Sequence, residues 1–433
     1  MRFSSTRAAA PPVGFSAALV QGLAPDGGLY VPQQWPQPAL ALLPDASKLP
    51  AVAEQFIAPF AQGDALAGEV GAITREAFNF PAPLVPLDAD GRLGVLELFH
   101  GPTAAFKDFG ARFLAACLTR IRQGQARPLR ILVATSGDTG GAVAAAFHRQ
   151  PGIEVVVLFP KGLVSPTQQQ QLTCWGDNIV SLAVQGTFDD CQRLVKEAFL
   201  DPTMRAEAEL SSANSINLGR LLPQAVYYAA TSLSVWRRHG EKASFIIPSG
   251  NLGNSVACLW ARQMGLPIGD IVLAHNANRT VTDYLESGTL RPRPSIATLA
   301  SAMDVGNPSN LERMTALFPD AATLGAALSA VSLSDAQIRA RIRTDFAARG
   351  QVWCPHTATA AEAYEGLAPQ RKASGRWVLV STAHPAKFRE IVEPLIGQRV
   401  AVPENLRRLF ELPSRFSQIP ATLAALRAAI GQG

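Results

Sequence analysis

Short apolar runs separated by helical patterns dominate the chain after residue 92. Such runs occur at 130–134, 154–159, 179–184, 245–247, 270–274 and 377–380. They lack the alternation of a half-exposed strand, which is typical of strands that are buried on both faces. Apolar positions at helical spacing lie between them, for example in 188–200 and 221–238. The pattern predicts an α/β fold with largely parallel sheets and helices on both faces.

The first 92 residues have a different pattern. Short apolar stretches alternate there with Pro and Gly, as at 27–32 and 80–83, while 45–78 has helical spacing. We therefore expect an N-terminal extension over residues 1–92. The whole chain has 433 residues, which is too long for one small domain and favours two packed lobes.

Composition narrows the class of protein. Hydrophobic residues make up 48% and charged residues 17%, the balance of a globular protein with a large core. The net charge of +5 is spread along the chain without a long basic run, so we expect no nucleic-acid partner. No apolar stretch approaches the ~20 residues that a membrane helix needs, so we expect no membrane partner.

The five cysteines are odd in number and far apart in the sequence. No two have the close spacing of a zinc or redox pair, and we expect no metal. We interpret them as free, mostly buried thiols in a reducing compartment, which favours the cytoplasm.

A candidate reactive lysine lies at the start of a predicted helix. Phe106, Phe109 and Phe113 fall on one apolar face of this helix, and Lys107 lies off that face in the first turn. The partial positive charge of a helix N-terminus disfavours the ammonium form, and the neutral amine attacks an aldehyde to make a Schiff base. A rigid Gly-Pro turn at 100–105 precedes the lysine. Alternatively, Lys107 is a solvated lysine on an amphipathic helix.

Two glycine-rich loops, at 135–141 and 249–254, each follow an apolar strand and open a helix. This arrangement directs backbone N–H groups and hydroxyls toward an anion. Neither loop has the spacing of a dinucleotide-binding fingerprint or of a P-loop, so each alone fits an ordinary turn equally well. Together with a candidate lysine they indicate a ligand that carries a phosphate.

Two further polar segments lie close to predicted elements. The segment 214–220 combines two amides, a hydroxyl and Arg220, which suits a second phosphate, although an ordinary capped helix entry has the same residues. The segment 381–388 follows an apolar strand, so the hydroxyl of Thr382 is expected to face the ligand crevice of the sheet. His384 in this segment is interpreted as a capped structural histidine.

Taken together, these motifs resemble the threonine synthase family of fold-type-II pyridoxal-phosphate enzymes, in its longer bacterial and fungal branch. The likeness extends over nearly the whole chain. The motifs that carry it are at 22–32, 78–83, 97–103, 106–110, 136–140, 212–217, 248–253, 302–305 and 382–388. The family implies a fold like that of the tryptophan synthase β chain. Its parts would be the extension 1–92, a larger lobe over 93–129 and 223–433, and a smaller lobe over 130–222.

The resemblance also implies an activity. The family converts O-phospho-L-homoserine and water into L-threonine and phosphate by γ-elimination and β-addition, the last step of threonine biosynthesis. Alternatives on the same scaffold are a related phospholyase and a serine/threonine dehydratase; a non-catalytic metabolite-binding module is an alternative of another class. A dehydratase needs no binding site for a second phosphate, because its substrates carry none. We expect a monomer or a weak homodimer.

The site residues follow from the same resemblance. The catalytic residue would be Lys107, which holds the aldehyde of pyridoxal 5'-phosphate as a Schiff base and moves protons. Other cofactor-binding residues would be Asp138, Gly250, Asn251, Leu252, Gly253, Asn254 and Thr382, the last at the pyridine nitrogen. Substrate-binding residues would be Ser136, Thr139, Asn214, Ser215 and Arg220. Many fold-type-II enzymes have Asn where this chain has Asp138, and no role is assigned to Asp304 or Asn307.

Overall fold

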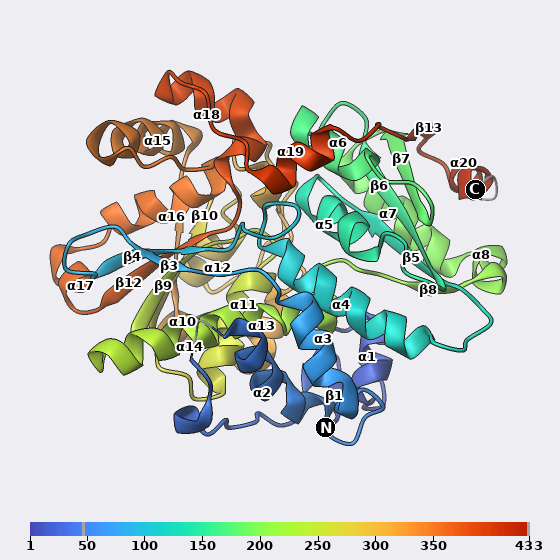
Figure 1. The fold of residues 1–433 in the computed structure, drawn as a ribbon, viewed down its shortest axis with the longest axis horizontal. Coiled ribbons are helices and arrows are strands. Elements are labelled where there is room, and N and C mark those ends of the chain that lie inside the picture. Colours follow the sequence, from blue (N-terminus) through green and yellow to red (C-terminus); the bar gives the residue numbers. More distant parts are fainter. Residues whose placement is uncertain (46–47, 431–433) are drawn as a thin grey trace.

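The computed structural model describes residues 1–45 and 48–430. Two sheets form two lobes that stand side by side, and the N-terminal helices lie below them in the view of Figure 1. The described strands are β1 (Phe3–Ser5), β2 (Tyr30–Pro32), β3 (Leu84–Pro86), β4 (Leu93–Glu97), β5 (Leu129–Ala134), β6 (Ile153–Pro160), β7 (Ile179–Gln185), β8 (Glu209–Ser211), β9 (Ala243–Pro248), β10 (Ile268–His275), β11 (Ser329–Ser332), β12 (Arg376–Ser381) and β13 (Ser417–Pro420).

The helices connect and cover these strands. Those described are α1 (Phe15–Gln21), α2 (Leu49–Ala61), α3 (Val70–Ala77), α4 (Lys107–Arg122), α5 (Asp138–Phe147), α6 (Pro166–Thr173), α7 (Phe188–Leu200), α8 (Pro202–Glu207), α9 (Leu218–Leu221), α10 (Gln224–His239), α11 (Gly253–Gln263), α12 (Thr280–Ser287), α13 (Leu311–Leu317), α14 (Ala321–Ala327), α15 (Asp335–Arg349), α16 (Pro355–Glu365), α17 (Pro369–Ala373), α18 (Arg389–Ile396), α19 (Glu404–Phe410) and α20 (Leu423–Ile430). Residues 46–47, within the stretch expected to be helical, lie outside the described residues.

The smaller lobe is built on a sheet with the described order β13-β7-β6-β5-β8, in which neighbouring strands are parallel. Leu132 of β5 faces the core under α7, whereas Ile131 and Val133 face the core that contains α5, and all three are fully buried. Burial on both faces explains why these strands are apolar without alternation. The prediction of parallel strands covered on both sides is confirmed.

The larger lobe has the described strand order β11-β10-β9-β12-β4-β3, and its pairs are parallel except β3 with β4. Val378 of β12 packs in the core that contains α10 and α11, while Leu379 packs in the core that contains α15 and α16. β3 lies within the expected extension 1–92, yet it forms the edge of this sheet.

The C-terminal segment crosses back to the smaller lobe. β13 pairs with β7, placing Ile419 opposite Val184, and Leu426 of α20 packs in the same core. Figure 1 shows this crossing as the red segment that runs from α19 to the far side of the β7 sheet. The division expected from the sequence placed 223–433 in the larger lobe, so the position of the last strand differs from that expectation.

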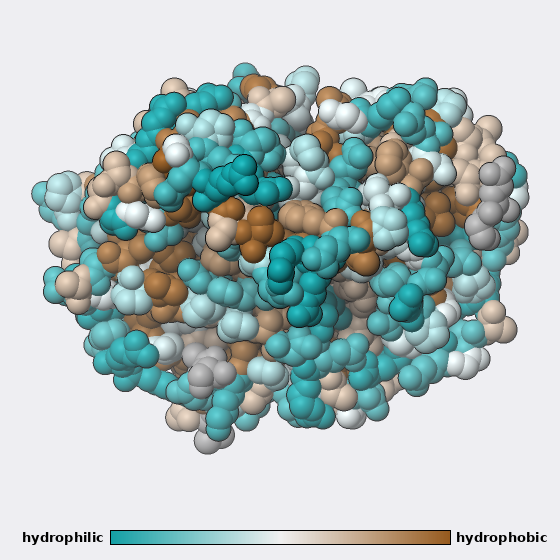
Figure 2. All heavy atoms as spheres, turned by 45° about the horizontal axis from the view of Figure 1, so that its top comes forward, coloured by the Kyte–Doolittle hydropathy of each residue, from teal (hydrophilic) through white to brown (hydrophobic). Residues whose placement is uncertain are grey.

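The N-terminal extension has an aromatic core of its own. The ring of Phe3 contacts Phe15 and Phe60, with centroids 5.7 and 6.5 Å apart. The five cysteines of the chain are buried and free, as expected. In the part of the chain that the structure describes, no helix combines the length and apolarity needed to cross a bilayer. On the face drawn in Figure 2, hydrophilic residues predominate and hydrophobic ones gather in separate patches.

Candidate active site

A cavity of about 1130 Å³ opens where the strands of both lobes end. β5, β9 and β12 each run into a loop that lines it, as expected at the carboxyl edge of parallel sheets. The structure brings every residue singled out from the sequence to this cavity: Lys107, Ser136, Asp138, Thr139, Asn214, Ser215, Arg220, Gly250, Asn251, Leu252, Gly253, Asn254 and Thr382. Their shared location is therefore observed, while their individual roles remain predictions.

Lys107 begins α4 behind a turn that is bonded to the end of β12. The N–H of Phe106 donates to the carbonyl of Thr382 at 2.9 Å. Asp108 accepts from both the N–H and the hydroxyl of Thr103, at 2.8 and 2.6 Å, which fixes the preceding turn. Lys107 is half-buried and lines the cavity, so its amine is held in place beside Thr382 rather than in solvent.

The amine of Lys107 has an environment that favours its neutral form. Burial lowers the pKa of Lys107 from 10.5 to about 8, while the charge of Asp138 opposes this shift and those of Arg220 and Lys387 add to it. The direction agrees with the argument from the helix N-terminus, but the main physical cause is burial. A substantial fraction of the amine is therefore neutral and nucleophilic near physiological pH.

The loop between β9 and α11 has the features of an anion-binding turn. Leu252 adopts a left-handed φ of +65°, and no side chain caps α11, which leaves its first N–H groups free for a ligand. A Cβ at Gly250 would lie 2.7 Å from the Cα of Met303, so only glycine fits against the neighbouring segment.

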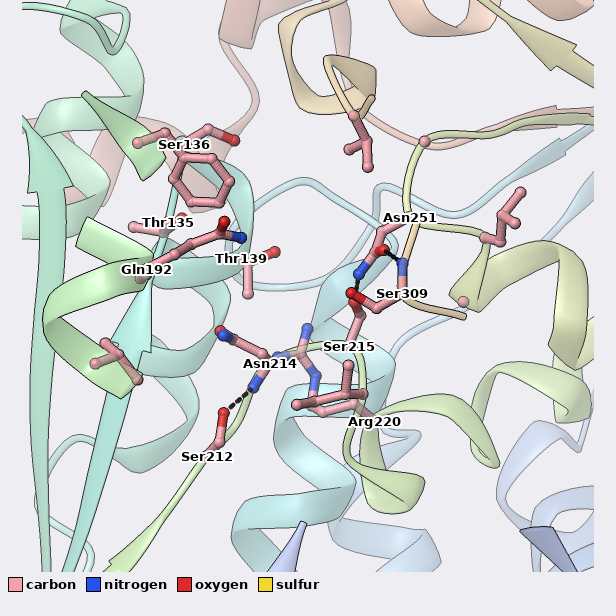
Figure 3. A pocket seen from close by; sticks show the side chains of 18 of the residues that line it. Thr135, Ser136, Thr139, Gln192, Ser212, Asn214, Ser215, Arg220, Asn251 and Ser309 are labelled. Carbon is pink, nitrogen blue, oxygen red and sulfur yellow. Dashed lines mark hydrogen bonds between the residues drawn. The ribbon is translucent and has the colours of Figure 1, made fainter. Parts of the chain in front are cut away.

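Two asparagines of this loop are held from behind. Asn251 donates from Nδ2 to the hydroxyl of Ser215 at 2.6 Å and accepts from the N–H of Ser309 at 2.6 Å (Figure 3). Oδ1 of Asn254 accepts from the hydroxyls of Tyr227 and Tyr228, at 2.5 and 2.8 Å. Nδ2 of Asn254 is buried without a partner within the described residues, which leaves a donor for a ligand.

The loop after β5 is braced by its own first residue. The hydroxyl oxygen of Thr135 accepts from the N–H groups of Gly137 and Gly140, at 3.0 and 2.9 Å. Ser136 and Thr139 extend from this braced turn to line the smaller-lobe side of the cavity, opposite Asn251 (Figure 3).

Asp138 is engaged within the protein. Its Oδ1 lies 3.0 Å from Nζ of Lys387 and accepts from Nε2 of Gln168 at 3.2 Å. Burial alone would raise the pKa of Asp138, but the positive charges of Lys387 and Lys107 outweigh burial and hold that pKa well below its usual range. The carboxylate of Asp138 is thus charged and paired with Lys387. The cofactor is expected to bind next to this carboxylate.

Lys387 was not identified as a site residue from the sequence. It follows β12, is completely buried, and also donates to the carbonyl of Thr103 at 2.9 Å. Because Lys387 belongs to the larger lobe and Asp138 to the smaller lobe, their ion pair links the two lobes beside Lys107. The available signal was the position of Lys387 in the segment after a strand, where Thr382 was recognised.

Arg220 is an almost fully buried cation on the cavity floor. Nη1 donates to the carbonyl of Ala213, and Nε has no partner within the described residues. A Cβ at Gly110 would lie 2.4 Å from the carbonyl oxygen of Arg220, so this glycine allows α4 to pack against α9. Oδ1 of Asn214, close by in Figure 3, is also buried without a partner among the described groups. This arrangement suits an anion with several oxygens.

Other polar groups at the cavity are neutral or structural. Burial lowers the pKa of His356 to about 4, and Nε2 of this neutral ring accepts from the N–H of Ala302 at 3.0 Å. Burial raises the pKa of Asp304 to about 6, and its Oδ1 accepts from Asn276 and Thr298, both at 2.7 Å. Asp304 thus shapes the loop that lines the cavity. His384 is not among the residues that line the cavity, and its Nδ1 accepts from the N–H of Ala386 at 3.1 Å, so this side chain caps the turn that follows β12.

The residues present fit pyridoxal phosphate. An amine with a lowered pKa suits an aldehyde, an uncapped helix N-terminus suits a phosphate, and the buried hydroxyl of Thr382 suits a ring nitrogen. Among the described residues, no group of three or more His, Cys, Asp or Glu is placed to hold a metal ion.

Comparison with known proteins identifies the family. A family model described as pyridoxal-phosphate dependent enzyme matches residues 76–383. Models for the threonine synthase N terminus and for the threonine synthase C-terminal region match 2–78 and 357–430. Threonine synthase from Haemophilus influenzae is 40% identical over 96% of both chains, and that from Escherichia coli is 39% identical over 96% of both. The chain belongs to the threonine synthase family.

Solved threonine synthases have the same fold. The pyridoxal-phosphate-bound threonine synthase from Brucella melitensis matches with a TM-score of 0.91 and 35% identity, covering 100% of this chain and 99% of that one. The Escherichia coli threonine synthase matches with a TM-score of 0.89 and 36% identity over the whole of both chains. The predicted fold class and the predicted cofactor of this threonine synthase family member are thereby confirmed.

Proposed function

We propose that the protein converts O-phospho-L-homoserine and water into L-threonine and inorganic phosphate. The observation that carries this proposal is the presence of two separate anion-binding elements in one cavity. The uncapped N-terminus of α11 suits the cofactor phosphate, and buried Arg220 with Asn214 suits a second phosphate. A substrate with its own phosphate requires both elements.

The residues that would hold pyridoxal phosphate are Lys107 at the aldehyde, 250–254 at the phosphate and Thr382 at the ring nitrogen. When bound, the cofactor supplies an electron-accepting ring that stabilises negative charge on the substrate carbons. The side chain of Thr382 offers a neutral hydroxyl. Unlike a carboxylate, this hydroxyl would not stabilise a protonated ring nitrogen. Asp138, fixed by Lys387, would lie beside the cofactor as a buried negative charge.

Lys107 would move the protons of the reaction. Its Nζ would take a proton from Cα and then from Cβ of the substrate, and would return a proton to Cα at the end. The lowered pKa of about 8 makes both the loss and the gain of a proton at Nζ accessible near neutral pH. A lysine with an ordinary pKa would stay protonated and would be a poor base.

The substrate would be held at both of its charged ends. Arg220, Asn214 and Ser215 would bind its phosphate, and Ser136 and Thr139 would bind its carboxylate. Fixing both ends restricts the carbons between them, which aligns the bonds to be broken. The bond between Cγ and the phosphate oxygen breaks, and the proton taken from Cβ would be returned at Cγ, which becomes the methyl carbon. Water adds its oxygen at Cβ and gives its remaining proton to the departing phosphate, so that the products balance the reactants.

The test is to incubate the cofactor-loaded protein with O-phospho-L-homoserine and to measure threonine and phosphate. We expect the two products in equal amounts. A phospholyase would instead release phosphate, ammonia and a 2-oxo acid, and a dehydratase would act on serine or threonine without releasing phosphate. Either product pattern, without threonine, would reject the proposed function.

We also propose an oligomeric state and a cellular location for the protein. A monomer or weak homodimer that binds no nucleic acid fits an enzyme whose cavity is complete within one chain. The five free thiols fit a reducing compartment, for which we propose the cytoplasm. Light scattering of the purified protein over a range of concentrations would test the oligomeric state.

A further inference from the structure

A buried arginine outside the cavity contacts three separate parts of the chain. Arg313 of α13 has no exposed surface. Its Nε donates to the carbonyl of Tyr30 at 3.1 Å, Nη1 to Oδ1 of Asn310 at 2.7 Å, and Nη2 to the carbonyl of Ile216 at 2.7 Å. The hydrogen-bond acceptors of Arg313 among the described residues are all neutral oxygens, and they stabilise the buried charge.

Asn310 links Arg313 to the two segments that are proposed to bind phosphate, 214–216 and 250–254. It is also fully buried, and its Nδ2 donates to the carbonyls of Ser215 at 3.2 Å and of Asn251 at 3.0 Å. Asn251 in turn donates to the hydroxyl of Ser215, as Figure 3 shows. A continuous set of hydrogen bonds thus runs from Tyr30 in the N-terminal extension, through Arg313 and Asn310, to both segments.

We propose that Arg313 and Asn310 are positioning residues that fix the two phosphate-binding segments relative to each other and to the N-terminal extension. The inference rests on the proposed function, because it takes 214–216 to bind the substrate phosphate and 250–254 to bind that of the cofactor. The planar guanidinium donates to three acceptors in fixed directions, which the ammonium group of a lysine cannot do. Holding the carbonyls of Ser215 and Asn251 fixes the peptide planes whose N–H groups would face the phosphates.

A matched control lies elsewhere in the chain. Arg237 of α10 also donates to three backbone carbonyls of the extension, those of Leu40, Leu43 and Pro44, but it is exposed and does not line the cavity. Arg237→Lys therefore weakens attachment of the extension without touching either phosphate-binding segment. A merely structural role of Arg313 would make Arg313→Lys behave in the same way.

The experiment compares four variants with the unmodified enzyme. Asn310→Asp is isosteric and still accepts from Arg313, but it loses both donations to the segments; Asn310→Ala loses them without adding a charge. Arg313→Lys tests whether the several fixed donors of the guanidinium are needed, and Arg237→Lys is the control. The affinity of the apo-enzyme for pyridoxal phosphate is read from visible absorbance, alongside KM, kcat and the thermal midpoint.

We expect Asn310→Ala, Asn310→Asp and Arg313→Lys each to weaken cofactor affinity and raise KM by about tenfold or more, with smaller changes in kcat. Arg237→Lys should change neither constant. The proposal is overturned if folded Asn310→Ala and Arg313→Lys match the unmodified enzyme, or if only Asn310→Asp is impaired, which would indicate charge repulsion. Cofactor titration needs no substrate, so inactivity of the unmodified enzyme would reject the proposed function while leaving this test valid.

Discussion

The cavity has two walls that differ in how their polar groups are bonded. The wall proposed to bind the cofactor phosphate, residues 250–254 and called the cofactor wall, is held in place by hydrogen bonds from surrounding residues. Both ends of the Asn251 amide are bonded, and Asn254 accepts from Tyr227 and Tyr228. What this wall leaves for a ligand is a set of fixed donors, the backbone N–H groups of α11 and one buried amide of Asn254.

The polar groups of Ser136, Thr139 and Asn214, proposed to bind substrate and called the substrate wall, have fewer hydrogen-bond partners. Within the described residues the hydroxyls of Ser136 and Thr139 have no hydrogen-bond partner, and neither has Oδ1 of Asn214. Oδ1 of Asn214 is a buried atom, and a buried polar atom without a partner is costly and is expected where a ligand supplies the missing bond. Ser136 and Thr139 are half-buried, so their hydroxyls are open to a ligand at the cavity. We therefore expect the cofactor side to be more fully bonded in advance than the substrate side, whose open polar groups a substrate would engage.

The largest effect is expected from removing the lysine that lies between these walls. Lys107→Ala should lower threonine formation by about 10⁴-fold or more, because both the covalent hold on the cofactor and the proton-transfer group are lost. The cofactor wall stays intact, so the variant should still bind pyridoxal phosphate, but borohydride should not attach it to the protein. Lys242→Ala, an exposed lysine, is the control. Normal threonine formation by Lys107→Ala would refute the assignment.

The link between the lobes should have the next largest effect, on stability. Lys387→Met leaves the buried Asp138 without its partner, which should cost roughly 3–5 kcal/mol of unfolding free energy at pH 7. Asp138 has a lowered pKa in the folded state, so its contribution is present above its usual pKa of 3.8 and is lost as pH falls further. The deficit should therefore shrink in acid.

Urea unfolding of Lys387→Met from pH 7 to pH 3 measures this dependence. The double variant Lys387→Met with Asp138→Asn is the control, because it removes the unpaired charge and should recover much of the stability at pH 7. A deficit that is the same at every pH, with no recovery in the double variant, would show that packing and not the ion pair links the lobes.

Arg220 tests the substrate side. Arg220→Ala should raise KM for O-phospho-L-homoserine about 10- to 100-fold, since a hydrogen-bonded charge on the phosphate is lost. Cofactor affinity should change little, because the cofactor wall does not include this residue. Arg220→Lys should recover only part of the loss, as a point charge replaces the fork. An unchanged KM would remove Arg220 from the substrate site.

Much of the fold was predictable because burial on both faces leaves a direct trace in the sequence. The apolar run 154–159 lies within β6, and the loops that follow β5, β9 and β12 line one cavity because parallel strands end at a common edge. β13 left no such trace. It has only four residues, it includes a proline, and it pairs with a strand more than 200 residues earlier.

The candidate site was predictable where a local motif carries the chemistry, and not where packing does. Lys107, 250–254 and Arg220 each belong to a recognisable turn or helix start. Lys387 and Arg313 do not, because a lysine or arginine in a helical segment looks the same whether it is solvated or buried. Partners far away in the sequence hold these two cations, Asp138 and Thr103 for Lys387. For Arg313 the distant partners are Tyr30 and Ile216.

The smallest effect is expected from loosening the cofactor wall by one hydrogen bond. Tyr228→Phe removes one donation to Asn254, while that from Tyr227 remains, so affinity of the apo-enzyme for pyridoxal phosphate should fall about two- to tenfold. KM for substrate at saturating cofactor should stay unchanged, because this amide belongs to the wall that is built in advance. Tyr364→Phe, away from the cavity, is the control. If Tyr228→Phe raised KM as much as it weakened cofactor binding, the two walls would not be independent.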